Sequence, residues 1–129
     1  MTEFSAGITA ESYPSSIAAG PDGNLWFTEL DGGRIGRITP TGVVTEFSAG
    51  ISPTSAPVAI AMGADGNMWF TEYNGDSIGR ITPTGTVTEF WVGGNSGPIG
   101  IAAGPDGNLW FTEWVYENRI GRITPTGQI

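Results

Sequence analysis

The sequence predicts an all-β protein of the β-propeller class, made of three copies of one four-stranded unit. One stretch of ten residues stands almost unchanged at 20–29, 63–72 and 104–113. Aligned on this stretch, the three repeats cover residues 2–44, 45–87 and 88–129. A repeat of this length, four short strands in each copy, and a chain with 21 glycines and 9 prolines indicate propeller blades and disfavour pairs of helices.

The first unit shows why each strand is expected. Asp22-Gly23 lies between two apolar runs and is a strong signal for a tight hairpin turn. Behind it, Leu25-Trp26-Phe27 places apolar side chains on both faces of the sheet, so both faces must be covered. A second turn is expected at Pro40-Thr41-Gly42. The four strands expected in this unit are 17–19, 24–29, 34–39 and 43–47.

Three blades alone form an open arc, because closed propellers have about four to eight blades. The two outer faces would then expose apolar residues that the inner blades bury, so the chain is expected to associate with itself. The expected ring is a six-bladed homodimer with two identical junctions, and a nine-bladed trimer is the alternative. Residues 127–129 would begin a fourth strand that residues 1–4 of the next copy complete. Trp110 and Ile123 are expected on the open face of the third unit.

The composition narrows the chemistry. A net charge of −8 opposes binding to nucleic acid or to an anionic membrane surface. No stretch has membrane-spanning length, and the N-terminus lacks the pattern of a signal peptide. The chain has no Cys, His or Lys, which removes thiolate, imidazole and Schiff-base chemistry and any zinc site built on Cys or His. The compartment of the protein is unknown from these residues.

Three motifs carry a family resemblance: Pro-Asp-Gly-Asn-Leu-Trp-Phe-Thr-Glu, then Arg-Ile-Gly-Arg-Ile-Thr-Pro, then Thr-Glu-Phe. Units with these motifs resemble the repeats of virginiamycin B lyase (streptogramin lyase), over residues 2–129. The resemblance implies seven blades at full length, and an enzyme branch that linearises cyclic depsipeptide antibiotics by elimination, with a His base beside magnesium. Because this chain has no His, no catalytic residue carries over. The first two units agree at 29 of 43 positions, which indicates a recently amplified array or an engineered or reconstructed half propeller. A three-blade fragment of a longer propeller is the alternative.

The units differ most in two connections, the loop that enters the first strand and the turn between the second and third strands. Both are expected at the same end of the sheet, where a scaffold carries variable binding loops. Aromatic and acidic side chains gathered there would suit a sugar, a cationic peptide or an ammonium ligand; the alternative is that they only cover the blade edges. The rim residues expected there are Tyr13, Tyr73, Trp91, Trp114, Tyr116, Glu11, Asp31, Asp76 and Glu117.

Two further sets repeat in every unit. Glu29, Glu72 and Glu113 end the second strand, where carboxylates could hold Mg²⁺ or Ca²⁺ or could pair within the fold. Repetition in every unit favours the structural role, and no cofactor is expected. The second set consists of arginines that are expected to stack on tryptophans across a hairpin. We expect them to have a structural role, as clamps that hold neighbouring blades together. These residues are Arg37, Arg80 and Arg122 with Trp26, Trp69 and Trp110.

The sequence therefore favours a non-catalytic, self-assembling half propeller whose partner is a second copy of itself. A ligand-binding propeller that uses the variable rim is the alternative. A lyase of the streptogramin-lyase type is less favoured because the chain contains no His.

Overall fold

The computed structural model describes residues 1–116 and 118–129, and within them it contains eleven β-strands and no helix. The strands form antiparallel sheets, as the sequence predicts. Their bounds are β1 (Pro14–Ala19), β2 (Leu25–Glu29), β3 (Arg34–Ile38), β4 (Val44–Phe47), β5 (Pro57–Met62), β6 (Met68–Glu72), β7 (Ser77–Ile81), β8 (Val87–Trp91), β9 (Pro98–Ala103), β10 (Leu109–Glu113) and β11 (Arg119–Ile123).

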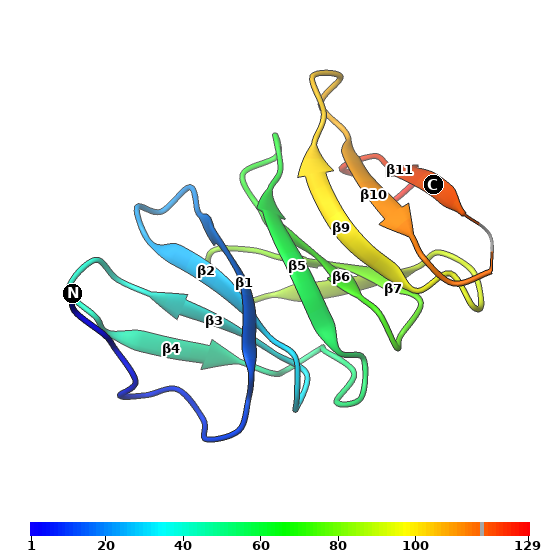
Figure 1. Ribbon diagram of the computed structural model, residues 1–129. Helices are drawn as coiled ribbons and strands as arrows, with labels where there is room; N and C mark the ends of the chain where they lie inside the picture. Colours follow the sequence, from blue (N-terminus) through cyan, green and yellow to red (C-terminus); the bar gives the residue numbers. More distant parts are fainter. Residues whose placement is uncertain (117) are drawn as a thin grey trace.

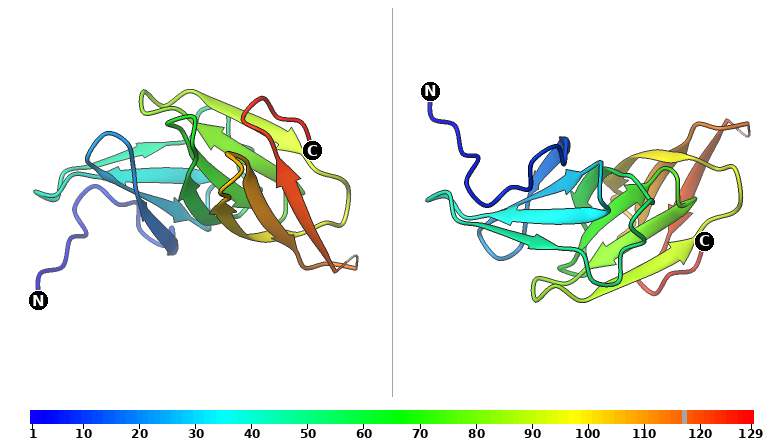
Figure 2. Two further views of the ribbon diagram at one scale, coloured as in Figure 1. Left: turned by 90° about the horizontal axis from the view of Figure 1, so that it is seen from above. Right: turned by 90° about the horizontal axis from the view of Figure 1, so that it is seen from below.

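The strands are grouped into three blades that stand side by side in an arc (Figure 1). The first blade has the order β1-β2-β3-β4, the second β5-β6-β7-β8, and the third β9-β10-β11. Strands β1, β5 and β9 contact one another in succession, so they line the inner side of the arc. The two termini lie far apart, at opposite ends of the arc (Figures 1 and 2). Among the described residues, no helix has the length and apolar character needed to cross a bilayer.

The first hairpin of each blade closes at the repeated Asp-Gly turn, where Gly23 adopts a φ of 78° that favours glycine. The Asp22 carboxylate accepts hydrogen bonds from Asn24 and from the Trp26 indole nitrogen, the latter at 3.0 Å. Burial of Asp22 opposes ionisation, but these hydrogen bonds outweigh it and lower the pKa of Asp22. The turn therefore also fixes the tryptophan of the following strand.

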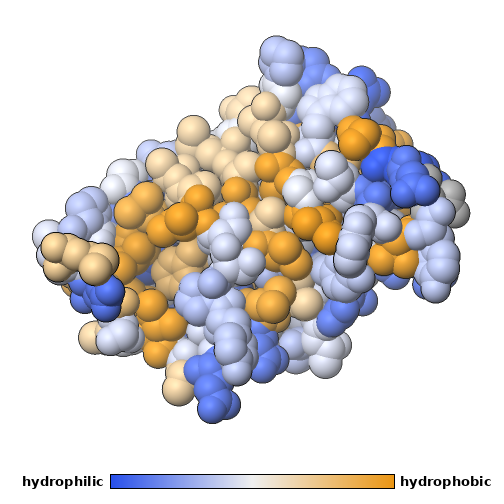
Figure 3. Space-filling model, in the orientation of Figure 1, coloured by the Kyte–Doolittle hydropathy of each residue, from blue (hydrophilic) through white to orange (hydrophobic). Residues whose placement is uncertain are grey.

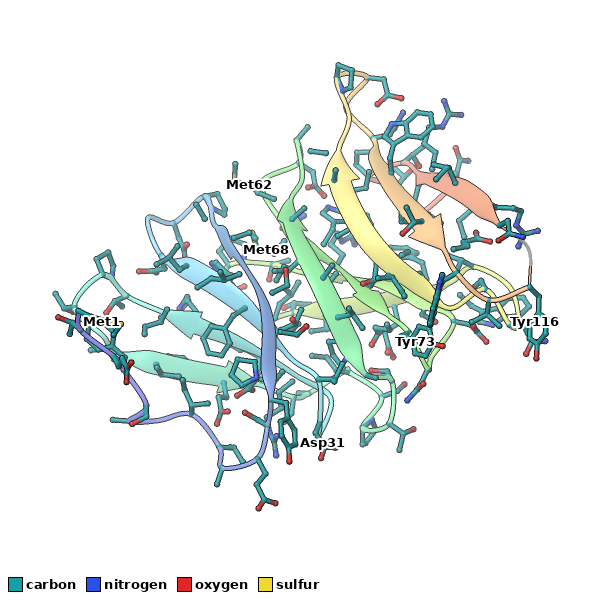
Figure 4. The ribbon with its side chains drawn as sticks, in the orientation of Figure 1. Met1, Asp31, Met62, Met68, Tyr73 and Tyr116 are labelled. Atoms are coloured by element: carbon teal, nitrogen blue, oxygen red, sulfur yellow. The ribbon has the colours of Figure 1, made fainter. Side chains whose placement is uncertain are left out.

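The core lies in the junctions between blades. Apolar side chains of the facing sheets interdigitate there, as they do in stacked sheets generally. Met68 is fully buried in the first junction and Phe111 almost fully in the second (Figure 4 labels Met68). The first junction contains Trp26, Ile35, Ile51, Ile60, Met68, Phe70 and Ile81, and the second contains Trp69, Ile78, Leu109, Phe111 and Ile123.

Within one chain the third blade has three strands, and no fourth strand pairs with β11 within the described residues. The fourth strand expected here is shared between two copies, so it stays a prediction. One expectation about the third blade is wrong. Ile123 does not lie on the open face but is fully buried against the second blade. The reason is strand alternation: Trp110 pairs with Arg122, so these two share one face, while Ile123 pairs with Leu109 and points to the other.

Candidate functional site

The first blade has an uncovered apolar face, here called the leading face, which consists of the exposed Phe4, Ile17 and Leu25, the half-buried Ile8 and Ile38, and the buried Phe27. Side chains of this face line a hollow of about 360 Å³. In the repeat, Ile17 corresponds to Ile60 and Leu25 to Met68, which lie in the junction between the first and second blades. Ile17 is 61% exposed and Ile60 only 6%. The leading face is therefore a junction surface without its covering blade. Figure 3 shows hydrophobic side chains gathered over the first blade, on the left.

The third blade exposes the opposite half of such a junction, here called the trailing face, which consists of Ala102, Trp110, Thr112, Ile120 and Arg122. A hollow at this face is lined by Trp110, Thr112 and Ile120. Trp110 is 39% exposed, although its counterparts Trp26 and Trp69 are fully buried. The two open faces thus correspond to the two sides of an internal blade junction.

Arginines clamp each internal junction. Arg37 lies 5.4 Å from the centroid of the Trp26 ring, opposite which it pairs in register, and it also lies over Phe47. Its guanidinium reaches across to the second blade and donates to the Pro83 carbonyl at 3.0 Å. Asp22, 3.8 Å away, adds an ion pair. The predicted stacking of Arg37 on Trp26 is thus present, together with a hydrogen bond between blades.

The second junction repeats this arrangement of arginine, tryptophan and proline carbonyl. The trailing face has the arginine and the tryptophan of the same arrangement. Arg80 lies over Trp69 and donates to the Pro125 carbonyl of the third blade at 2.7 Å. Arg122 lies 5.7 Å over Trp110 in the same way, on a face that no blade covers. The Arg122 guanidinium therefore already stacks on Trp110, at the position where it would contact a further blade.

A threonine makes a second contact across each junction. Thr28 donates to the Val58 carbonyl at 2.9 Å, and Thr71 donates to the Ile99 carbonyl at 2.6 Å. Each of these hydroxyls also accepts a backbone N–H from the first strand of its own blade, beside the irregularity in that strand. Thr112 accepts the equivalent bond from Gly100. Sequence reasoning missed this role, although the threonine recurs in every Trp-Phe-Thr-Glu motif.

The N-terminal segment lies against the first blade as a fourth strand lies against the blade that follows it. The Phe4 ring covers Gly42, just as Phe47 covers Gly85 and Phe90 covers Gly127. Phe47 also stacks on Trp26, with 5.5 Å between ring centroids, so this aromatic residue bridges two blades. Residues 2–4 repeat the sequence of 45–47, which lies in β4. They therefore occupy the place of the fourth strand of a preceding blade.

The repeated glutamates at the ends of β2, β6 and β10 are buried, and the first two face a second carboxylate. No hydrogen-bond partner lies within bonding geometry of either carboxylate oxygen of Glu29 or of Glu72 among the described residues. Burial raises the pKa of Glu72 to about 8, and the nearby Glu89 carboxylate adds to the shift. Burial likewise raises the pKa of Glu29 to about 7, with Glu46 adding and Arg34 opposing. Ser77 replaces this arginine in the second blade.

Glu113 has a different environment. Arg119 donates to its carboxylate at 2.8 Å, at the open edge of the third blade. No group of three or more Asp, Glu, His or Cys side chains that could hold a metal ion is found in the described part of the chain. Within one chain, Glu29 and Glu72 each lie beside a second carboxylate, and Glu113 pairs with an arginine.

The two variable connections lie side by side, as predicted. In the turn after β2, the backbone N–H of Leu30 donates to the Tyr13 carbonyl and that of Asp31 donates to the Ser12 carbonyl. The later blades repeat this pattern. The rim residues do not converge on one point, however: Asp31, Tyr73 and Tyr116 lie at successive places along the same edge of the arc (Figure 4). Tyr13 lies in the entering loop beside the turn that holds Asp31, and Trp91 ends β8; both are exposed, as is Glu11.

Within this rim, the structure brings one aromatic pair together. The rings of Tyr73 and Trp114, which come from different blades, have centroids 6.2 Å apart. Asp76 is occupied by the loop that enters the third blade: it accepts from the backbone of Asn95 and Gly97, at 2.9 and 3.0 Å. Burial opposes ionisation of Asp76, but these bonds lower its pKa. The expected rim residue Glu117 lies outside the described residues.

Comparisons with known proteins agree with this architecture. The sequence pattern described as the virginiamycin B lyase family matches residues 1–129. Virginiamycin B lyase of Bordetella parapertussis is 47% identical over 45 residues, which are 35% of this chain and 15% of that protein.

Two solved structures of virginiamycin B lyase from Staphylococcus aureus are similar to the whole arc. One is 44% identical, with a TM-score of 0.93, over 98% of this chain and 43% of that chain. The other is a catalytically inactive variant with a histidine replaced by alanine, with quinupristin; it is 45% identical, with a TM-score of 0.88, over 94% and 41% of the two chains. This chain therefore spans less than half the length of the solved relatives.

Proposed function

This chain belongs to the virginiamycin B lyase family, and we propose that it is a non-catalytic three-bladed module that completes a propeller ring by packing against a second copy of itself. One observation carries the proposal: the trailing and leading faces correspond, residue by residue, to the two sides of the internal junctions. Trp110 stands in the place of Trp26 and Trp69, while Ile17 stands in the place of Ile60. A second copy would cover both faces with contacts that the chain already uses twice.

The hydrogen bonds across the junction support the same docking. Arg37 and Arg80 each donate to a proline carbonyl of the following blade, and the equivalent acceptor for Arg122 is the Pro40 carbonyl of a second copy. Phe4 of that copy would stack on Trp110 as Phe47 stacks on Trp26. A head-to-tail contact can close into a ring, and two copies then give two equivalent junctions and six blades.

The lack of histidine supports the non-catalytic part of the proposal. A histidine is the residue replaced in the catalytically inactive S. aureus variant, and this chain has none. Quinupristin incubated with a high concentration of the chain should therefore remain cyclic, as observed by mass spectrometry. A linear product formed at a rate proportional to protein concentration would contradict this part.

Complementary variants test the docking. Ile17→Glu places a charge on the leading face, and Trp110→Glu places one on the trailing face; burying either charge in a junction is costly. Each variant alone should remain monomeric, because every junction it forms contains a charge. An equimolar mixture should form a heterodimer through the one junction that pairs two unaltered faces. If the mixture stays monomeric while the unaltered chain associates, head-to-tail docking is wrong.

Binding at the rim is a second candidate, favoured by the Tyr73–Trp114 pair. Trp114 is 69% exposed beside a second aromatic ring, which suits a sugar or a cationic ligand. A panel of neutral sugars and quaternary ammonium ions, titrated against tryptophan fluorescence, tests it. Saturable quenching that disappears in Trp114→Ala and persists in Trp91→Ala would support this candidate, and no saturable change with any probe would remove it.

A further inference from the structure

Arg119 opens strand β11 at the free edge of the third blade. Its guanidinium donates to the Glu113 carboxylate, and its side chain is 49% exposed. In register, Arg119 pairs with Glu113 as Arg34 pairs with Glu29 in the first blade. The same arginine and glutamate thus lie opposite each other in register in both blades, and at the open edge they form an ion pair of 2.8 Å.

In the first blade, this pair has a third member on the neighbouring fourth strand. Burial raises the pKa of Glu29, the nearby Glu46 of β4 adds to this rise, and the charge of Arg34 opposes it. Arg34 also favours the ionised form of Glu46 on the fourth strand. A guanidinium suits this role because it carries five N–H donors in a planar fork.

The third blade has no fourth-strand glutamate within the chain, but the repeat supplies one at the other end. Thr2-Glu3-Phe4 repeats as Thr45-Glu46-Phe47 and as Thr88-Glu89-Phe90. Phe4 already lies against Gly42 as Phe47 lies against Gly85. When the N-terminal segment of a second copy pairs with β11, its Glu3 occupies the position that Glu46 has beside Arg34.

The entering loop of the third blade lacks a residue that could repeat a contact made by the entering loops of the first two blades to their fourth-strand glutamates. Thr9 donates its backbone N–H and its hydroxyl to Glu46, and Ser52 does the same for Glu89. Thr9 follows the partly buried Ile8 of its loop, and Ser52 follows the buried Ile51. The residue in that position of the third loop, after Val92, is Gly93, which has no hydroxyl.

We propose that Arg119 is the specificity-determining residue of the junction between two copies, where it receives Glu3 of the second copy between itself and Glu113. The inference rests on the proposed head-to-tail assembly and adds the polar contact that sets its register. The apolar faces supply most of the contact, but apolar packing alone is non-directional. A charged contact at the strand edge fixes which strand pairs with β11.

The experiment compares matched serine variants by sedimentation in a dilution series. Arg119→Ser introduces the residue that the second blade carries at this position, Ser77, so the fold accommodates it. Arg119→Ser should raise the dissociation constant of the dimer roughly three- to tenfold. Arg34→Ser removes the equivalent arginine inside the chain and should leave the dissociation constant unchanged. Thermal melting checks that both variants remain folded.

A double-mutant cycle assigns the partner. Glu3→Gln should weaken association as Arg119→Ser does, and the double variant should be no weaker than either single one, because the two residues share one contact. Additive effects, or an unaltered dissociation constant in Arg119→Ser, would overturn the role of Arg119 while leaving the assembly intact. If the unaltered chain never associates, the proposed function fails as well, so the two failures are distinguishable.

Discussion

Arg37 of the first blade donates a hydrogen bond to the Pro83 carbonyl of the second blade at 3.0 Å while its guanidinium lies over Trp26. Arg80 repeats the contact with Pro125 at 2.7 Å, and Arg122 is the third arginine of the series. The same clamp therefore stabilises the chain twice from within and is available a third time at its open face.

Replacing the clamp arginines one at a time separates these two uses. Arg37→Ala should lower the free energy of unfolding of the monomer by about 1–3 kcal/mol, because it leaves a junction carbonyl without its charged donor. Arg122→Ala should change the unfolding of the monomer little and should weaken association instead. Urea unfolding below the association range, together with native mass measurements, distinguishes the two effects. Equal destabilisation of the monomer by both variants would argue against the clamp.

Variants of Trp110 and Trp114 test whether all exposed tryptophans contribute equally to association. Trp110→Glu should abolish association, since the charge would be buried in the junction. Trp114→Glu changes another exposed tryptophan, which lies on the rim and outside the trailing face, and should leave the native mass unchanged. Loss of association in both variants would point to general surface hydrophobicity rather than to a defined face.

The turn aspartates should matter according to the burial of their tryptophans. The Asp65 carboxylate accepts from Trp69 at 3.0 Å, and the Trp69 ring is fully buried. Asp65→Ala leaves that buried N–H without its partner and should lower the free energy of unfolding by about 1–3 kcal/mol. Asp106→Ala removes the same bond to the partly exposed Trp110 and should cost less. Chemical denaturation of the two variants compares them directly, and an equal cost would contradict the explanation.

Glycines on the third strand are expected to be sterically required. A Cβ at Gly79 would collide with the ring of the buried Phe70, which has no room to move. Gly79→Ala should therefore destabilise the chain by at least about 2 kcal/mol. Gly66→Ala is the control: nothing lies within 4 Å of its added Cβ, so only the left-handed φ of 77° opposes it, at about 1 kcal/mol. Thermal unfolding that ranks the two in the reverse order would contradict the packing described.

The Glu72–Glu89 pair predicts a pH dependence of stability. The pKa of Glu72 rises from 4.5 to about 8 on folding, so between these values the folded chain holds a proton that the unfolded chain has lost. The contribution of Glu72 to the free energy of unfolding should therefore be greatest at low pH. It should fall as the pH rises toward 8, by at most about 1.4 kcal/mol for each pH unit. Glu72→Gln should flatten this fall and raise the stability at pH 8.

A second variant checks the cause of that shift. Ser77→Arg supplies the arginine that the other two blades carry, and its charge should lower the pKa of Glu72 and also reduce the slope. Denaturant unfolding between pH 5 and about 8 measures both variants. A slope that stays unchanged in Glu72→Gln would show that this carboxyl does not control the dependence.

The repeat allowed most of the fold to be predicted. The Asp-Gly turn, the both-sided apolar strand and the Thr-Pro-Thr-Gly turn recur three times, so the four antiparallel strands of the first two blades and the stacking of Arg37 on Trp26 follow from local rules. Ile123 was misplaced because the face of a strand depends on its register, and a shift of one residue reverses the assignment.

The candidate site was less predictable. Glu46 and Glu89 approach Glu29 and Glu72 only because the second and fourth strands lie on either side of the third, and this cross-strand proximity leaves no local motif. The rim residues were expected to gather, but the curvature of the arc spreads the described ones along one edge, where a ring contact joins Tyr73 with Trp114. Proximity across blades depends on the packing angle, which no single unit encodes.

The most direct test of the assembly is the native mass of the unaltered chain, by size-exclusion chromatography with light scattering over a dilution series. A six-bladed dimer should appear as a species of about 27 kDa, twice the 13.5 kDa of one chain, that dissociates on dilution. A mass near three times that of one chain would retain the head-to-tail junction but change the ring from six blades to nine. A stable 13.5 kDa species at every concentration would contradict the central claim that the two open faces pack against each other.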